Sequence, residues 1–185
     1  MHIIGIAGSL RRASLNRALL TAAIELAPSS LTIEIHTLEG VPLFDPDTEA
    51  TGETVALAAL REAFRSADGM LFATPEYNAS VPGVLKNAID CLSRPHGRSA
   101  LRGKPAGIIG ASPGAVGTAR AQAHLRTVLS HAGMPVMSVP EVFVGLARER
   151  FDAEGRLIDP KTREVLGRCL AALAVWVERN RSTRD

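Results

Sequence analysis

Two polar stretches, each after a short apolar run, carry the side chains best suited to chemistry. The first, GSLRRASLNR, spans residues 8–17. The second, TPEYNASVPG, spans residues 74–83 and holds the only tyrosine of the chain, Tyr77, between an acid and an amide. The first stretch is rich in hydroxyl and guanidinium groups, which bind phosphate. The second can line a flat heteroaromatic ring with backbone and amide groups.

The first stretch has the composition of an anion-binding loop that leads into a helix. A helix N-terminus offers unpaired N–H groups and a positive dipole end. The polar side chains that the stretch adds are Ser9, Arg11, Arg12, Ser14 and Asn16. It contains neither GxxxxGK[ST] nor GxGxxG and no carboxylate to help hold Mg²⁺. These features favour a phosphate monoester held without metal, such as that of FMN. In the simpler alternative, Ser14 or Asn16 caps the helix and both arginines are solvated.

The second stretch predicts a turn directly after a strand. Thr74 precedes Pro75 and is therefore restricted to extended geometry, which would end the strand. Asn78 and backbone groups of the turn could meet the edge of a ring while Tyr77 packs beside it. Composition supports equally a plain capped turn, in which Asn78 or Ser80 caps the next helix.

The chain alternates between strand-like and helix-like segments. The apolar, β-branched segments predict strands over residues 3–8, 31–38, 69–74, 105–112 and 134–144. The segments with helical spacing predict helices over residues 16–27, 53–67, 81–94, 115–133 and 159–179. This alternation predicts one domain, residues 1–185, with a parallel sheet covered on both faces. Ligands of such sheets lie beyond the carboxyl ends of the strands, which selects the loops 8–17, 74–83 and 111–117. In the third loop, Gly114 and Gly117 either let the backbone approach a ring or serve a turn with positive φ.

Composition excludes several classes of function. The net charge is +2 and the arginines are scattered, so no basic patch for nucleic acid is indicated. No apolar stretch approaches the roughly 18 residues of a membrane span. Cys91 and Cys169 form no CxxC pair, which suits a reducing compartment and predicts a cytoplasmic protein. His124 and His131 could share a helix face, but no third ligand lies at metal-site spacing.

Together, GSLRRASLNR and PEYNASVPGVLKNAIDCLSR resemble the NADPH-dependent FMN reductase family, which includes quinone, azo-compound and chromate reductases. The resemblance runs through nearly the whole chain. It implies a flavodoxin-like three-layer α/β fold, with a five-stranded parallel sheet in the order 2-1-3-4-5 and helices on both faces. It also implies FMN and NADPH as cofactors, with NADH as the alternative donor, and a homodimer or homotetramer with FMN near a subunit boundary.

The resemblance assigns cofactor-binding roles in all three loops. The FMN phosphate would be held by Arg11, Ser14, Leu15 and Asn16, with Ser9 nearby. The isoalloxazine would be lined by Pro75, Glu76, Tyr77 and Asn78, with Ser112 and Gly114 from the third loop. No catalytic side chain and no metal are implied. The chain departs from the family at Cys91, where members often carry an aromatic residue, and Ala79 occupies a variable position.

The expected activity is hydride transfer from NADPH to FMN and then to a quinone, azo, chromate or similar small-molecule acceptor, with ping-pong kinetics. Arg94, Arg98 and Arg102 are candidates for binding the 2′-phosphate of NADPH. The main alternative is a flavodoxin-like electron carrier without NADPH turnover. Such carriers usually present an acidic face, and the net charge of +2 argues against one. A second alternative is a flavin-free regulatory or phosphate-binding module.

Overall fold

The computed structural model describes residues 1–47 and 52–181 and contains a parallel sheet in the strand order β2-β1-β3-β4-β5. The strands are β1 (His2–Ala7), β2 (Thr32–His36), β3 (Gly69–Ala73), β4 (Ala106–Ala111) and β5 (Val142–Val144). The helices are α1 (Leu15–Leu26), α2 (Val55–Ser66), α3 (Gly83–Leu92), α4 (Ala119–His131) and α5 (Pro160–Arg181), with a 3₁₀ turn, η2 (Ala147–Glu149). The predicted alternation and strand order are confirmed.

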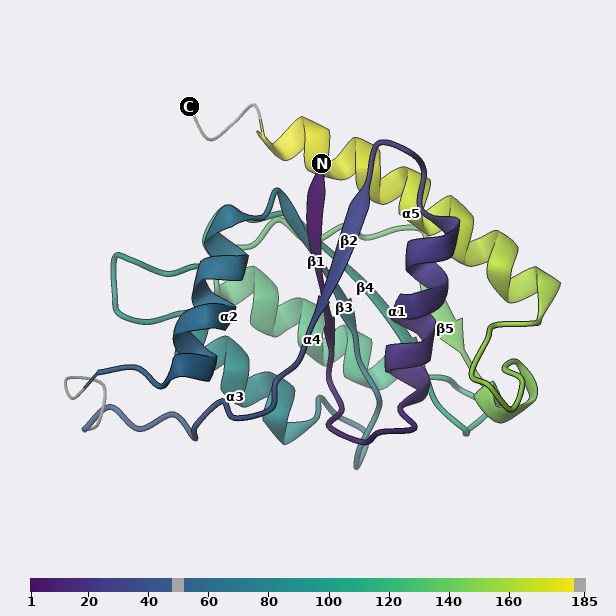
Figure 1. The fold of residues 1–185 in the computed structure, drawn as a ribbon, viewed down its shortest axis with the longest axis horizontal. Helices are drawn as coiled ribbons and strands as arrows, with labels where there is room; N and C mark the ends of the chain where they lie inside the picture. Colours follow the sequence, from purple (N-terminus) through teal and green to yellow (C-terminus); the bar gives the residue numbers. More distant parts are fainter. Residues whose placement is uncertain (48–51, 182–185) are drawn as a thin grey trace.

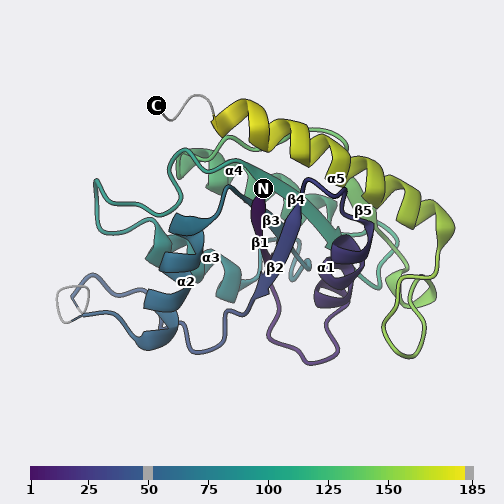
Figure 2. The ribbon, with the colours of Figure 1, turned by 45° about the horizontal axis from the view of Figure 1, so that its top comes forward.

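The sheet is the middle of three layers, with a hydrophobic core on each face. Helices α1 and α5 cover one face, where Leu19, Leu170 and Leu173 are fully buried (Figure 1). Helices α2, α3 and α4 cover the other, around Phe64 and Leu125 (Figure 2). Every residue of β3 and β4 is buried. Strands buried on both faces lack an alternating pattern, which explains their continuous apolar sequences.

The last strand is shorter than the predicted segment 134–144. Only Val142–Val144 pairs with β4, while Val136 forms an isolated bridge to Ala106. The intervening chain contains Pro140, which has no N–H to donate to a ladder, and this favours a break in the strand.

Helix α4 also begins later than residue 115, where the predicted helix began. Gly117 has a φ of 67°, and the helix begins only at Ala119. A residue in the left-handed conformation cannot belong to a right-handed helix. Residues 115–117 therefore form a turn that precedes α4.

Because all five strands are parallel, the loops that follow them open along one edge of the sheet. In Figure 1, β1 runs downward from the N-terminus, and the loops after β1 and β3 lie along the lower side. Gly8 lets the first two loops pack closely, because a Cβ there would lie 3.0 Å from Leu85 Cδ2 and 3.1 Å from Pro75 Cδ. No helix among the described residues combines the length and apolar character required to span a bilayer.

Candidate functional site

A cavity of about 290 Å³ lies at the carboxyl edge of the sheet, where the loops after β1, β3 and β4 meet. Nine of the eleven predicted site residues line it: Ser9, Arg11, Ser14, Leu15, Asn16, Pro75, Glu76, Tyr77 and Ser112. The other two, Asn78 and Gly114, are outside its lining. The structure thus brings together side chains that are more than 90 residues apart in the sequence.

The N-terminus of α1 forms one end of this cavity. Ser14 is the N-cap, and its Oγ accepts a hydrogen bond from the Arg17 N–H at 3.3 Å. Ser9 Oγ accepts from the Arg11 N–H at 3.3 Å, which bends the preceding loop back on itself. The first N–H groups of a helix have no intrahelical partner, and here they open onto a cavity lined by hydroxyls and the Arg11 guanidinium. This donor set fits a phosphate monoester.

Asn16 ties the first loop to the end of β4. Its Nδ2 donates to the Ala111 carbonyl at 2.9 Å, and its Oδ1 accepts from the Ala111 N–H at 2.9 Å. Asn16 is 2% exposed, and both polar atoms of its amide bind the Ala111 backbone. Its side chain therefore fixes the position of the first loop relative to β4.

The second loop ends in a two-residue hairpin. Tyr77 and Ser80 exchange backbone hydrogen bonds of 3.2 and 3.0 Å, while Asn78 and Ala79 have φ values of 50° and 62°. Two left-handed central residues define the type I′ turn preferred in two-residue hairpins. Asn tolerates this conformation, but Ala costs about 1–2 kcal/mol there. The hairpin presents Tyr77, which is 51% exposed, with its hydroxyl 3.4 Å from Ser9 Oγ.

The plain capped-turn interpretation of this loop is wrong in its detail. The N-cap of α3 is Pro82, which makes no side-chain capping bond. Ser80 Oγ instead lies 3.0 Å from His124 Nδ1 on α4. The hairpin is therefore anchored to α4 rather than to the helix that follows it.

Glu76 anchors the same loop to the N-terminus of α4. Its carboxylate accepts from the Arg120 N–H at 3.0 Å, from the Ala121 N–H at 3.1 Å and from Arg120 Nε at 2.6 Å. Burial of this side chain, 5% exposed, opposes its ionisation, but these donors and the Arg120 charge hold its pKa below the ordinary value. Glu76 stays ionised and stabilises the positive end of a helix.

The third loop contributes Ser112. Its N–H donates to the Val144 carbonyl at 3.0 Å and its Oγ to the Gly117 carbonyl at 2.6 Å. Gly117 is left-handed, which confirms the turn interpretation at that position. Gly114 is not among the glycines with positive φ, so its conformation does not require glycine.

Arg148 is a lining residue that the sequence analysis missed. It lies on η2, after β5, and lines both this cavity and an adjoining one of about 500 Å³ that contains Arg12, Arg17 and Arg156. A signal was available, because a fifth parallel strand must also place its following loop at the carboxyl edge. Arg148 therefore adds a second arginine, beside Arg11, to the lining of the cavity.

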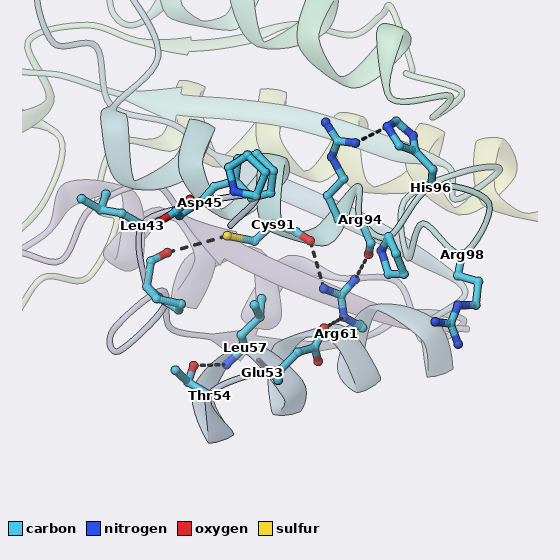
Figure 3. A pocket seen from close by; sticks show the side chains of 15 residues that line it. Leu43, Asp45, Glu53, Thr54, Leu57, Arg61, Cys91, Arg94, His96 and Arg98 are labelled. Atoms are coloured by element: carbon cyan, nitrogen blue, oxygen red, sulfur yellow. Dashed lines mark hydrogen bonds and ion pairs between the residues drawn. The ribbon is translucent and has the colours of Figure 1, made fainter. Parts of the chain in front are cut away.

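A buried arginine organises the far end of α3. Arg61 on α2 is 5% exposed, and its guanidinium donates to the carbonyls of Cys91 at 3.0 Å, Leu92 at 3.3 Å and Arg94 (Figure 3). Its Nε also donates to Glu53 Oε1 at 2.5 Å. The carbonyls that end a helix lack intrahelical partners, so one cation satisfies the negative end of α3.

The three arginines predicted to meet the 2′-phosphate do not share one cavity. Arg94 and Arg98 line a cavity of about 750 Å³ beside α2, whereas Arg102 lines, with Arg94, a separate cleft of about 960 Å³ between α3 and α4. Figure 3 shows the Arg94 side chain meeting His96, while Arg98 extends to another side.

Comparison with known proteins identifies the family. A family model described as NADPH-dependent FMN reductase matches residues 1–149. The chain belongs to the NADPH-dependent FMN reductase family. It is 49% identical over 181 residues to an NAD(P)H-dependent FMN reductase of Pseudomonas aeruginosa, covering 98% of this chain and 97% of the relative. It is 42% identical over 181 residues to a 2-hydroxy-1,4-benzoquinone reductase of a Burkholderia species, covering 98% of each.

Solved structures agree with this assignment. FerB, a flavoenzyme NAD(P)H:(acceptor) oxidoreductase of Paracoccus denitrificans, superposes with a TM-score of 0.89 and 36% identity over 97% of this chain and 98% of that chain. An archaeal flavodoxin shares the fold alone, with a TM-score of 0.65 and 14% identity. This reductase-family member is an oxidoreductase of flavodoxin-like fold with FMN and NAD(P)H as its cofactors.

Proposed function

We propose that this protein passes reducing equivalents from NADPH through FMN, bound in the 290 Å³ cavity, to a small-molecule acceptor, with quinones as the first class to test. The observation that carries the proposal is the convergence of nine predicted residues on that one cavity. When bound, FMN supplies the hydride and electron chemistry, accepting a hydride from NADPH and passing electrons to the acceptor.

The side chains have positioning and binding roles in this proposal. Ser9, Ser14, Arg11 and the N-terminus of α1 hold the phosphate, and Arg148 adds charge beside them. Pro75 and Tyr77 line the ring, with Ser112 facing it from the third loop. Glu76 and Asn16 fix the loops that carry these groups. Asn78 and Gly114 do not line the cavity, and the proposal gives them no binding role.

The kinetic scheme that follows is ping-pong. An acceptor and the nicotinamide would use the same space beside Tyr77, so NADP⁺ must leave before the acceptor enters. Relatives named quinone reductases, from Pseudomonas putida and Escherichia coli, are 45% and 37% identical to this chain and support quinones as acceptors. Azo compounds and chromate are further acceptors to test.

We further propose that each chain forms one domain over residues 1–185. The chains would assemble into a homodimer or homotetramer in the cytoplasm. Two buried free cysteines suit a reducing compartment. Light scattering coupled to gel filtration measures the oligomeric state directly.

The first experiment is an absorbance spectrum of the purified protein, before and after anaerobic addition of NADPH. Flavin bands that bleach with NADPH, and recover when a benzoquinone is added, are the expected result. Bands that do not bleach indicate an electron carrier. A protein that takes up no FMN, even when FMN is supplied, overturns the assignment of the cavity.

A further inference from the structure

The adjoining cavity of about 500 Å³ continues the proposed FMN cavity past the N-terminus of α1. It lies between α1 and the chain that follows β5, and Figures 1 and 2 both show these segments side by side. The lining that the two cavities share consists of Ala13, Ser14, Leu15 and Arg148. A ligand whose phosphate lies at this N-terminus can therefore extend into the adjoining cavity.

The adjoining cavity runs along one face of α1. The residues of this face, three or four positions apart, are Ser14, Arg17, Ala18, Thr21, Ala22 and Glu25. Residues 14–25 cover a rise of about 16 Å on the helix. Small side chains keep the space open, since a Cβ built on Gly155 in the opposite wall would lie 4.0 Å from the Ala18 Cβ. The cavity is thus long enough for a second nucleotide unit beyond the phosphate of FMN.

Three arginines in the lining of the adjoining cavity have no protein partner. Across residues 1–47 and 52–181, the guanidinium groups of Arg12, Arg17 and Arg148 make no hydrogen bond or ion pair. All three residues are exposed. Guanidinium groups bind phosphate oxygens and stack on aromatic rings, so these three are available to a ligand that has both.

The carboxylates of the adjoining cavity are already paired. Arg156 donates to Asp152 Oδ2 at 2.7 Å and to Glu154 Oε2 at 3.2 Å, and Arg163 lies 3.5 Å from Glu25 Oε2. These three acids would repel a bare polyanion. They can still accept hydrogen bonds from uncharged hydroxyl and amino groups. The lining therefore favours a ligand that combines a phosphate with a sugar and a base.

We propose that the adjoining cavity binds the adenosine monophosphate half of FAD, so that the protein accepts FAD as well as FMN. In this arrangement the second phosphate meets Arg12 and Arg148, and the adenine stacks on Arg17 above the apolar floor of Phe151 and Leu157. The inference rests on the proposed function, because the flavin ring must be bound in the 290 Å³ cavity.

The test is a calorimetric titration of the flavin-free protein with FMN and, separately, with FAD. FAD is expected to bind as tightly as FMN or more tightly. Arg17→Ala should weaken FAD binding about two- to fivefold, as for a cation–π contact at an exposed site. It should leave FMN binding unchanged, because it keeps the backbone N–H that donates to Ser14 and removes no residue of the 290 Å³ cavity. Arg65→Ala is the matched control, since it removes an exposed arginine of α2 that lines neither cavity.

A second variant fills the adjoining cavity instead of removing a charge from it. Ala18→Leu narrows the space beside Gly155, and Ala18 does not line the 290 Å³ cavity. The added side chain should weaken FAD binding about tenfold or more and leave FMN binding unchanged. Thermal melts show whether each variant folds, and mass spectrometry of the extracted cofactor shows that FAD was bound intact.

Each other outcome is decisive. A protein that binds FMN but binds FAD at least about a hundredfold more weakly overturns the inference and leaves the proposed function intact. FAD binding that neither variant changes places the adenosine outside the adjoining cavity and also overturns it. Binding of neither flavin refutes the proposed function, and this inference with it.

Discussion

Replacing Asn16 with alanine removes the two hydrogen bonds of 2.9 Å that join the first loop to Ala111. Because the site is 2% exposed, water cannot readily replace the lost amide, and the Ala111 N–H and carbonyl are left without a partner. Each unsatisfied buried group costs about 1–3 kcal/mol. Alanine returns roughly 0.5 kcal/mol through its higher helix propensity. For two such groups, less this gain, the expected loss of unfolding free energy is about 1.5–5.5 kcal/mol.

Urea unfolding of the FMN-free protein measures this loss without a contribution from cofactor binding. At a urea slope of about 2 kcal/mol/M, a loss of this size lowers the unfolding midpoint by about 1–3 M. Asn16→Asp keeps the acceptor for the Ala111 N–H but cannot donate to the carbonyl at neutral pH, so it should also destabilise. Thr21→Ala on the exposed side of α1 is the control, expected to change stability by less than about 0.5 kcal/mol.

A wild-type unfolding midpoint for Asn16→Ala would refute the positioning role of Asn16. If Asn16→Ala unfolds at the wild-type midpoint but loses FMN affinity, the side chain serves the phosphate rather than the strand. Loss of both stability and affinity supports the positioning role, since a displaced loop cannot hold a ligand.

Ala79→Gly should stabilise the protein by up to about 1 kcal/mol in thermal melts, because relief of left-handed strain exceeds the entropic cost of glycine; destabilisation would contradict the hairpin geometry. Glu76→Gln should cost stability at pH 7, and the cost should shrink as pH falls through the lowered pKa of the wild-type Glu76, where its carboxylate is protonated; an equal cost at pH 7 and at low pH would refute the ion pair with Arg120. Burial raises the pKa of the Cys169 thiol to about 12, so maleimide labelling at pH 8, read by mass spectrometry, should require unfolding; prompt labelling of the folded protein would be the contrary outcome.

The alternation of segments and the loop compositions could be interpreted from the sequence because they depend on local chemistry. Continuous apolar runs between amphipathic helices specify a parallel sheet, and a sheet of this kind places its ligand at the carboxyl edge. That reasoning located the cavity and most of its lining. It misjudged the length of β5, because Pro140 interrupts the predicted segment 134–144 and only Val142–Val144 forms the strand.

Tertiary structure alone decided what each polar side chain binds. The partner of Asn16 is 95 residues away, and those of Glu76 are 44 and 45 residues away, so no local pattern predicts that both anchor loops. Only the packed helices show that Arg148 lines the cavity and that Arg61 binds the end of α3. The same packing divides Arg94, Arg98 and Arg102 between two cavities. The physical reason is that the sequence specifies which hydrogen-bonding groups a side chain has, but not their partners. The partners depend on strand register and helix packing, which bring distant segments together.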